Sequence, residues 1–177
     1  MEVSTTVPQW LARRQLLTGR SIGVVPTMGA LHPGHSSLVE RCRRENDIAV
    51  VTLFVNPTQF NDPADLERYP RTVEADLALL QSLGTDHVLM PDAASLYPSG
   101  YQFRVTAGTL AGVMEGRHRP GFFEGVMTIV LKLLNLVGAG RAYFGEKDYQ
   151  QWKVLHAMAA DLFLPTEIIP CPTVREP

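Results

Sequence analysis

Two histidines lie three residues apart in a glycine-containing segment that follows a short apolar run. The segment reads Pro26-Thr27-Met28-Gly29-Ala30-Leu31-His32-Pro33-Gly34-His35. A helix that begins near Gly34 would offer unpaired backbone N–H groups and the positive end of its dipole to a phosphate. His32 and His35 could donate further hydrogen bonds to that phosphate as charge grows during attack on its phosphorus. Two alternatives stay open: ordinary loop histidines, or a metal site whose third ligand is not evident.

A second polar stretch, Phe54-Val55-Asn56-Pro57-Thr58-Gln59-Phe60, ends an apolar run of strand length. Asn56 and Gln59 carry neutral amides, which both donate and accept hydrogen bonds. Such groups suit a substrate with hydroxyl and carboxylate groups, because they bind it without a charge that would quench a nucleophile. The alternative is that Asn-Pro only forms a turn.

A third stretch, Phe144-Gly145-Glu146-Lys147-Asp148-Tyr149-Gln150-Gln151-Trp152, also leads from a predicted strand into a predicted helix. Lys147 can place positive charge on a phosphate, and Asp148 can cap the helix or bind the ribose of a nucleotide. Gln151, three residues later, can point back at a bound acid. A simple capped helix would explain the same residues without a ligand.

Short apolar runs alternate with longer amphipathic segments, which predicts a parallel sheet covered by helices. We predict strands over residues 22–25, 48–55, 87–90, 101–106, 141–144 and 166–169, and helices over 8–18, 34–45, 77–83, 124–137 and 148–162. No regular structure is expected after residue 169, because three prolines follow: Pro170, Pro172 and Pro177. The pattern predicts one α/β domain with a doubly wound parallel sheet. The loops after Val25, Val55 and Phe144 should converge at the carboxyl ends of its strands.

The composition excludes several classes of protein. Hydrophobic residues make up 45% of the chain, charged residues make up 19%, and the net charge is -2, so no basic patch indicates a nucleic-acid partner. Two cysteines far apart in sequence indicate no disulfide framework and fit a reducing cytoplasm. No apolar window reaches the roughly 18 residues of a membrane span. We therefore expect a cytoplasmic protein without a membrane or nucleic-acid partner.

Together the three stretches resemble the pantothenate synthetase family, the pantoate–β-alanine ligases. The His-x-Gly-His segment is also similar to the signature of the wider nucleotidyltransferase and class I aminoacyl-tRNA synthetase superfamily, whose members bind ATP there. The family's motifs occur in order along the chain, at residues 26–35, 54–60, 69–72, 145–151 and 172–176. The resemblance therefore implies the Rossmann-like fold of that superfamily.

The resemblance also implies roles for individual residues. It assigns catalysis to His35 as the proton donor, with His32 beside it on the phosphates and Lys147 as a further phosphate ligand. It assigns ATP binding to Met28, Gly29, Ala30, Leu31, His32, Pro33, Gly34, His35, Gly145, Glu146, Lys147, Asp148 and Val174. Pantoate and β-alanine would be bound by Gln59, Gln151 and Asn56.

The activity that the resemblance implies has two steps and no covalent enzyme intermediate. The pantoate carboxylate attacks the α-phosphorus of ATP and releases pyrophosphate, and the β-alanine amine then attacks the pantoyl adenylate and releases AMP. Mg²⁺ should accompany ATP with few protein ligands and no metal site built by the protein alone. The resemblance further implies a homodimer whose partners are otherwise small molecules.

The chain departs from the family in two respects. Phe122 and Glu124 stand where the family commonly has histidine and arginine, and we interpret both as surface packing. The family also continues beyond Arg175-Glu176 into a Ser-Ser-Arg-Asn segment and a small C-terminal lid domain, which this sequence does not contain. We therefore expect weak ATP binding and strongly reduced activity from these 177 residues alone.

Two other functions share some of these features. A nucleotidyltransferase acting on a phosphate acceptor, such as a pantetheine phosphate, would have the same histidine segment. It would need a basic residue for that phosphate, whereas this chain has Asn56 and Gln59 at the end of the second strand. A non-catalytic ligand-binding or dimerisation module is the other alternative, and failure of ATP and pantoate to change the melting temperature would favour it.

Overall fold

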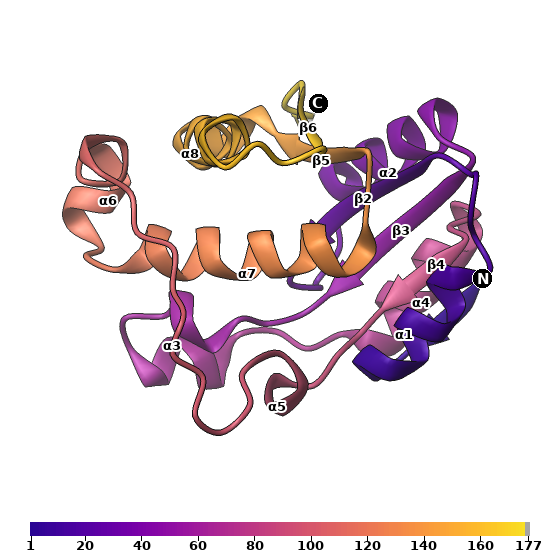
Figure 1. Cartoon of the computed structure of the whole chain (residues 1–177), viewed down its shortest axis with the longest axis horizontal. Helices are drawn as coiled ribbons and strands as arrows, with labels where there is room; N and C mark the ends of the chain where they lie inside the picture. The colour runs from indigo at the N-terminus through magenta and orange to yellow at the C-terminus, as the bar shows by residue number, and fades with distance from the viewer. Residues whose placement is uncertain (176–177) are drawn as a thin grey trace.

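A six-stranded sheet runs through the part of the chain that the structure, a computed structural model, describes, residues 1–175 (Figure 1). Neighbouring strands are all parallel, in the order β1-β4-β3-β2-β5-β6. The strands are β1 (Glu2–Ser4), β2 (Ile22–Thr27), β3 (Ile48–Leu53), β4 (His87–Leu89), β5 (Arg141–Gly145) and β6 (Glu167–Cys171). The predicted α/β fold with a doubly wound parallel sheet is confirmed.

Helices connect these strands and cover the sheet. The α-helices are α1 (Val7–Gln15), α2 (Pro33–Glu45), α3 (Pro63–Arg68), α4 (Val73–Ser82), α5 (Ala93–Leu96), α6 (Met114–His118), α7 (Phe122–Val137) and α8 (Tyr149–Asp161). Three short 3₁₀ turns within residues 1–175 are η1 (Pro57–Gln59), η2 (Thr109–Ala111) and η3 (Glu146–Asp148). Of these, η3 follows β5 directly and η1 follows β3 after residues 54–56, and both carry predicted site residues.

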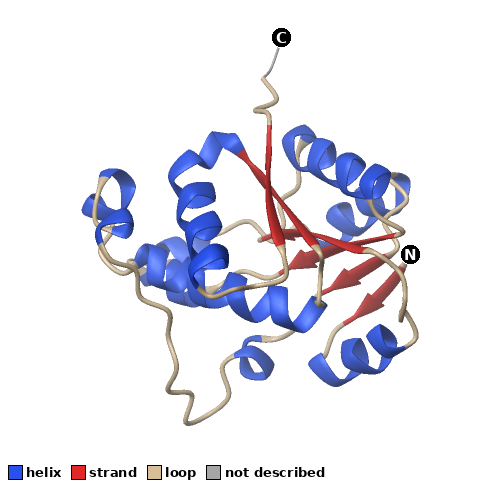
Figure 2. Cartoon of the chain, turned by 45° about the horizontal axis from the view of Figure 1, so that its top comes forward, coloured by secondary structure: helices blue, strands red, loops and turns tan. Residues whose placement is uncertain are grey.

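The two faces of the sheet carry separate apolar cores, because successive side chains of a strand point to opposite faces. On β2, Val24 packs with α1, α7 and α8, whereas Val25 packs with α2 and α4. Figure 2 shows helices on both sides of the strands. Burial on both faces explains why β3 is apolar throughout most of its length.

Helix α7 follows from a 16-residue run of helix-forming and apolar residues between two glycines. Gly121 before it and Gly138 after it have φ values of +82° and +66°, which favour glycine. The N–H of Gly138 donates to the carbonyl of Leu134 and ends the helix. The long helix carries the chain across the sheet to β5, beside α8 (Figure 1).

The strand order fixes where a ligand should bind. From β2 the chain winds through β3 and β4 in one direction, and α7 then brings it back to β5 on the other side of β2. The direction of winding therefore reverses between β2 and β5, and open α/β sheets bind their ligands outside the carboxyl ends of strands at such a point. The loops that follow these strands hold the predicted site residues.

Three predictions about the elements need correction. Residues 101–106 form no strand: this stretch is largely exposed, and the Val105 N–H donates to Thr128 Oγ1 instead of a strand. The free edge of β4 is occupied by the unpredicted β1, whose three residues are too few to show an alternation. Strand β6 continues through Pro170, which an edge strand tolerates because one of its sides needs no donor. Glu176 and Pro177 lie outside the described residues.

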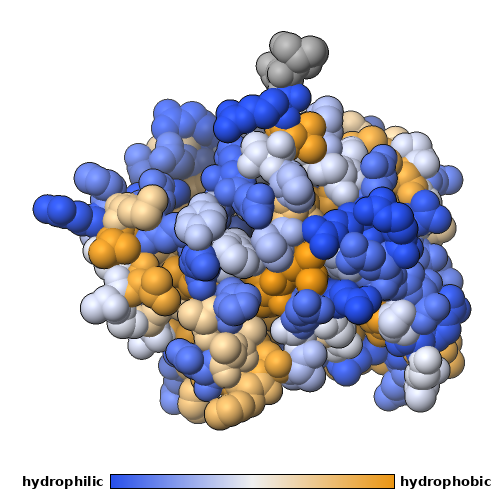
Figure 3. All heavy atoms as spheres, turned by 90° about the horizontal axis from the view of Figure 1, so that it is seen from above, coloured by the Kyte–Doolittle hydropathy of each residue, from blue (hydrophilic) through white to orange (hydrophobic). Residues whose placement is uncertain are grey.

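The face of the molecule in Figure 3 is mostly polar, with apolar residues interspersed among the polar ones. Phe103 and Phe163 are the most exposed of the large apolar side chains within residues 1–175, at 86% and 92%. None of the helices described in residues 1–175 is long and apolar enough to cross a membrane.

Candidate functional site

The start of α2 is built by the two histidines themselves. His32 is the N-cap and its Nδ1 accepts a hydrogen bond from the Gly34 N–H at 3.1 Å. The His32 N–H in turn points at Nδ1 of His35, 3.4 Å away. Each Nδ1 is therefore an acceptor, so the proton of each neutral ring lies on Nε2. The helix cap leaves both histidines with an Nε2–H group for a ligand.

His35 is neutral at physiological pH. Burial, followed by the neighbouring His32, lowers the pKa of His35 to about 4. The two rings lie 4.1 Å apart between centroids, tilted by 47°. His35 can therefore donate a hydrogen bond from Nε2, but it carries no proton to release as an imidazolium near pH 7.

The loop between β2 and α2 is held by a buried carboxylate that the sequence did not reveal. Asp76 on α4 accepts hydrogen bonds from the N–H groups of Ala30 and Leu31, at 3.0 and 2.8 Å. The Thr72 hydroxyl donates to the same side chain at 3.2 Å. Gly29 and Ala30 have φ values of +82° and +51°, so this loop has an unusual conformation. Asp76 satisfies the N–H groups that this conformation exposes.

Gln59 is held in place from two sides. Its Nε2 lies 2.9 Å from the sulfur of Met28, and its Oε1 accepts from Asn56 Nδ2 at 3.2 Å. Asn56 is buried, with 1% of its surface exposed. Its amide also donates to the Gly125 carbonyl and accepts from the Tyr97 hydroxyl. Its hydrogen-bonding groups are therefore used within the protein, behind Gln59.

The third predicted stretch follows β5. Lys147 and Asp148 lie on η3 with exposed side chains, and Lys147 Nζ lies 3.3 Å from Asp148 Oδ1. Gln151 lies in the first turn of α8 and is half-buried. The loop after β5 thus presents a cation, a carboxylate and an amide next to the histidine pair.

Two adjoining cavities bring these stretches together. The smaller, of about 150 Å³, is lined by His32, Gly34, His35, Gly145 and Val174, among others. The larger, of about 600 Å³, is lined by Met28, Gln59, Tyr69, Arg119 and Phe122, among others. Lys147, Asp148 and Gln151 line both. The arrangement offers donors and positive charge for an anion beside a wider space for a polar acid.

Not every predicted ligand residue faces these cavities. Gly29 lies at a neighbouring hollow, while Asn56, Ala30, Leu31, Pro33 and Glu146 line neither cavity. Phe122 packs under the Arg119 guanidinium, 3.8 Å from the ring centroid, and also lines the larger cavity. Glu124 lines a different hollow. The residue that replaces the family's histidine therefore borders the candidate site.

Arg119 is the second site residue that the sequence did not single out. Its Nη2 donates to the Gln59 carbonyl at 3.2 Å, and its Nη1 lies 3.2 Å from Glu115 Oε1. It therefore holds the backbone of Gln59, whereas Asn56 holds the side chain.

Comparison with known proteins decides the family. The family model described as Pantoate-beta-alanine ligase matches residues 2–177. The chain belongs to this family. Pantothenate synthetase from Aquifex aeolicus is 52% identical over 158 residues, which are 89% of this chain and 56% of that protein. The same enzyme from Legionella pneumophila (strain Corby) is 49% identical over 177 residues, which are 99% of this chain and 70% of that protein.

Solved structures of pantoate-β-alanine ligases have the same fold. A structure from Thermus thermophilus has a TM-score of 0.94 at 49% identity. The match covers 99% of this chain and 63% of the Thermus thermophilus chain. The Francisella tularensis structure, complexed with beta-gamma ATP and beta-alanine, has a TM-score of 0.97 at 42% identity. The match covers all of this chain and 69% of the Francisella tularensis chain. The chain thus spans roughly 56 to 70% of these relatives.

Proposed function

We propose that this chain carries the ATP- and pantoate-binding site for ATP-dependent ligation of pantoate to β-alanine, through a pantoyl adenylate. The observation that supports this most is the convergence of three loops on two adjoining cavities. One has the Nε2–H groups of the histidine pair, the other has Gln59, and Lys147 borders both. Membership of the pantoate-β-alanine ligase family supplies the substrates.

The first step joins the contents of the two cavities. ATP would lie in the smaller cavity, with its phosphates at the start of α2 and its adenine toward the backbone of Val174. Pantoate would lie in the larger cavity against Gln59 and Gln151. The pantoate carboxylate oxygen attacks the α-phosphorus in line, the bond to the β-phosphate oxygen breaks, and pyrophosphate leaves.

The second step uses the same positions. The β-alanine amine attacks the carbonyl carbon of the pantoyl adenylate, the bond from that carbon to the phosphate oxygen breaks, and AMP leaves. The amine loses a proton to solvent or phosphate. The protein contributes by orienting the reactants and by keeping water from the mixed anhydride.

The site residues divide into groups that touch ligand and groups that position them. The Nε2–H donors of His32 and His35, and the point charge of Lys147, would offset charge on the phosphates. Gln59 would bind both acids. Asn56, which is buried behind Gln59, would act by orienting the Gln59 amide.

Mg²⁺ would enter with ATP. Within residues 1–175 no group of three or more His, Cys, Asp or Glu side chains is arranged to hold a metal ion. Mg²⁺ commonly keeps several waters and takes one or two carboxylates besides phosphate oxygens. Asp148 is the carboxylate at the smaller cavity that could serve, and the ion would offset phosphate charge there.

A pyrophosphate-release assay with ATP, Mg²⁺ and pantoate tests the proposal, with and without β-alanine. We expect pyrophosphate with pantoate alone, and AMP release that depends on β-alanine. The assay compares residues 1–177 with the same chain continued by the C-terminal segment of the Legionella relative. We expect the shorter protein to bind ATP more weakly and to react more slowly, because full-length relatives contain the additional segment.

Each result of this assay has a defined meaning. Pyrophosphate release in the extended protein alone would support the chemistry and show that residues 1–177 supply the binding half. AMP formation that ignores β-alanine but needs a phosphate acceptor would favour a nucleotidyltransferase. No reaction in either protein, and no change of melting temperature with millimolar ATP or pantoate, would contradict the proposal.

A further inference from the structure

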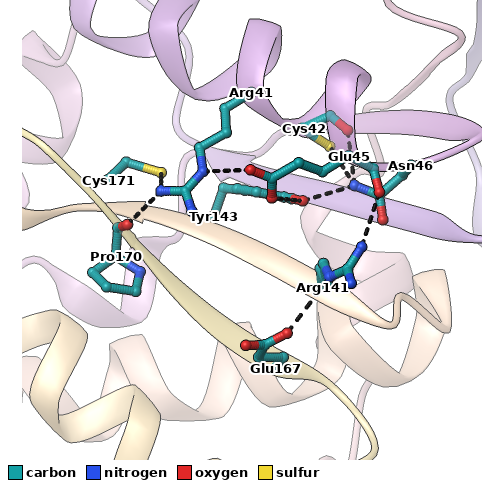
Figure 4. A network of polar contacts seen from close by, with 9 residues as sticks. All are labelled: Arg41, Cys42, Glu45, Asn46, Arg141, Tyr143, Glu167, Pro170 and Cys171. Carbon is teal, nitrogen blue, oxygen red and sulfur yellow. Dashed lines mark hydrogen bonds and ion pairs between the residues drawn. The ribbon is translucent and has the colours of Figure 1, made fainter.

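Arg41 joins α2 to the last strand of the sheet (Figure 4). Its Nη1 donates to the Pro170 carbonyl at 2.8 Å and lies 3.6 Å from the sulfur of Cys171. Its Nε donates to Glu45 Oε1 at 2.8 Å. The guanidinium also lies 6.0 Å from the ring centroid of Tyr143 on β5. One side chain thus touches α2, β5 and β6.

A wider network keeps Arg41 in this place (Figure 4). Glu45 Oε2 accepts a hydrogen bond from the Tyr143 hydroxyl at 3.0 Å. That hydroxyl accepts one from Asn46 Nδ2 at 2.8 Å. Arg141 donates to the backbone carbonyl of Glu45 at 2.9 Å, so β5 is also tied to the end of α2. The hydrogen bond from Arg41 is the main reason that the pKa of Glu45 is lowered. The carboxylate thus stays charged and holds the guanidinium.

Arg41 connects two segments that form walls of the smaller cavity. One wall is the start of α2 with His35, six residues before Arg41 and thus about 9 Å along the helix. The other is Pro172 to Val174, which begins two residues after Pro170. Tyr143 lines the same cavity. The distance between the two walls therefore depends on where Arg41 holds the end of β6.

Among residues 1–175, strand β6 is paired with β5 as far as Cys171, but on that side only. It is an edge strand, with β5 as its neighbour on one side. The chain from Pro172 onward belongs to no strand within the described residues. The hydrogen bond from Arg41 to the Pro170 carbonyl thus holds the last paired residues of β6, directly before the segment that lines the cavity.

We propose that Arg41 is a positioning residue that sets the adenosine side of the ATP site and so decides affinity for a nucleotide over a bare phosphate chain. The proposal rests on the proposed function, since it places adenine at Val174. The phosphates would lie against the histidine pair, whose cap does not involve Arg41. Loss of the guanidinium should therefore weaken binding of adenosine and leave binding of the phosphates unchanged.

The test measures two ligands with the same proteins. Titration calorimetry with ATP and with inorganic tripolyphosphate, both with Mg²⁺, is done on wild type and on Arg41→Met, which keeps the length of the side chain. We expect the ATP dissociation constant to rise about tenfold, as for loss of one charge-assisted hydrogen bond, and that of tripolyphosphate to change less than about twofold. Arg44→Met, an exposed position on the same helix, should change neither.

A second variant separates positioning from folding. Arg41→Lys keeps a donor that can reach the Pro170 carbonyl but cannot hold Glu45 at the same time, so we expect an intermediate loss for ATP alone. It also carries the test if circular dichroism shows that Arg41→Met does not fold. Equal weakening of ATP and tripolyphosphate, or no change for either ligand in both variants, would overturn the proposal. If wild type binds neither ligand, the proposed function itself fails and this inference fails with it.

Discussion

Each histidine at the start of α2 uses one ring nitrogen for the fold and leaves the other for chemistry. Nδ1 of His32 and of His35 accepts from a backbone N–H of the helix start, and Nε2–H remains. An alanine substitution would remove both functions together. Asparagine separates them, because its side-chain oxygen can replace Nδ1 as the acceptor but its amide does not reach as far as Nε2.

His35→Asn should therefore lower the rate of pyrophosphate release and leave the fold intact. Loss of one aligned donor to a transition state costs on the order of a hundredfold in rate. The free energy of unfolding should change by less than about 1 kcal/mol, because a cap acceptor remains. Stopped-flow or coupled assays and chemical denaturation measure the two quantities. His156→Asn, at an exposed position on α8, is the control. A rate within twofold of wild type would exclude His35 from the phosphate site.

The buried His35 should also make stability depend on pH. Its pKa in the folded protein is about 4, below its ordinary value of 6.5, so the unfolded chain takes up a proton first. The free energy of unfolding should therefore fall as the pH drops from about 6.5 to about 4. Above that range His35 should add no pH dependence, because its ring is neutral in both the folded and the unfolded state. The melting temperature of wild type minus that of His35→Asn should decrease over this window. His87, whose pKa burial also lowers, is present in both proteins and cancels. A constant difference would contradict the assigned burial of His35.

At the scale of elements, the position of Gln59 depends on how closely α7 approaches η1. A Cβ on Gly125 would lie 2.5 Å from the Thr58 carbonyl oxygen and 2.9 Å from the Gln59 nitrogen. The Gly125 carbonyl also accepts from Asn56, which holds Gln59. A glycine on α7 therefore lets the helix and the loop meet.

We expect Gly125→Ala to displace Gln59 and to raise the KM for pantoate by about tenfold or more, with a smaller effect on the KM for ATP. Overpacking at this contact should also cost about 1–3 kcal/mol of unfolding free energy. Steady-state kinetics with each substrate varied in turn measures the first effect. Gly140→Ala is the matched control, because a Cβ there would meet nothing within 4 Å. Equal rises in both KM values would show that the contact serves the fold alone.

The sequence predicted the elements that carry strong patterns. The apolar run of α7 and the β-branched run of β3 were identified because burial on one stripe or on two faces leaves a regular signal. Residues 101–106 alternate as a strand would, but the structure places them at neither outer edge of the sheet, β1 or β6. Pairing depends on whether the packing of the whole chain brings a segment to an edge, and a local pattern does not contain that information.

For the candidate site, the sequence likewise indicated some of the residues and missed others. The loops that carry His35, Gln59 and Lys147 could be found because each follows an apolar strand. Asp76 could not, because a carboxylate in the first turn of a helix usually faces solvent and favours the dipole. Its contacts with Ala30 and Leu31 span 46 and 45 residues, and only the packing of α4 against the sheet creates them.

On the scale of the whole molecule, several apolar side chains remain exposed in the stretch of chain from residue 103 to residue 114. Phe103, Leu110, Val113 and Met114 are 86%, 47%, 49% and 66% exposed. Isolated exposed apolar residues need no explanation, but several that follow closely in sequence make this stretch a candidate for contact with another molecule. The family resemblance implies a homodimer, and this stretch is where we expect the second copy to contact the first.

Phe103→Glu should therefore shift the protein toward monomer, because a carboxylate would have to be buried without a partner in the dimer. Sedimentation equilibrium over a range of protein concentrations measures the dimer dissociation constant, which we expect to rise at least tenfold. Phe163→Glu is the matched control, since Phe163 is 92% exposed on the loop after α8 and lies outside that stretch. A monomeric wild type would contradict the homodimer. A dimer that tolerates Phe103→Glu but not Phe163→Glu would place the contact at the end of α8 instead.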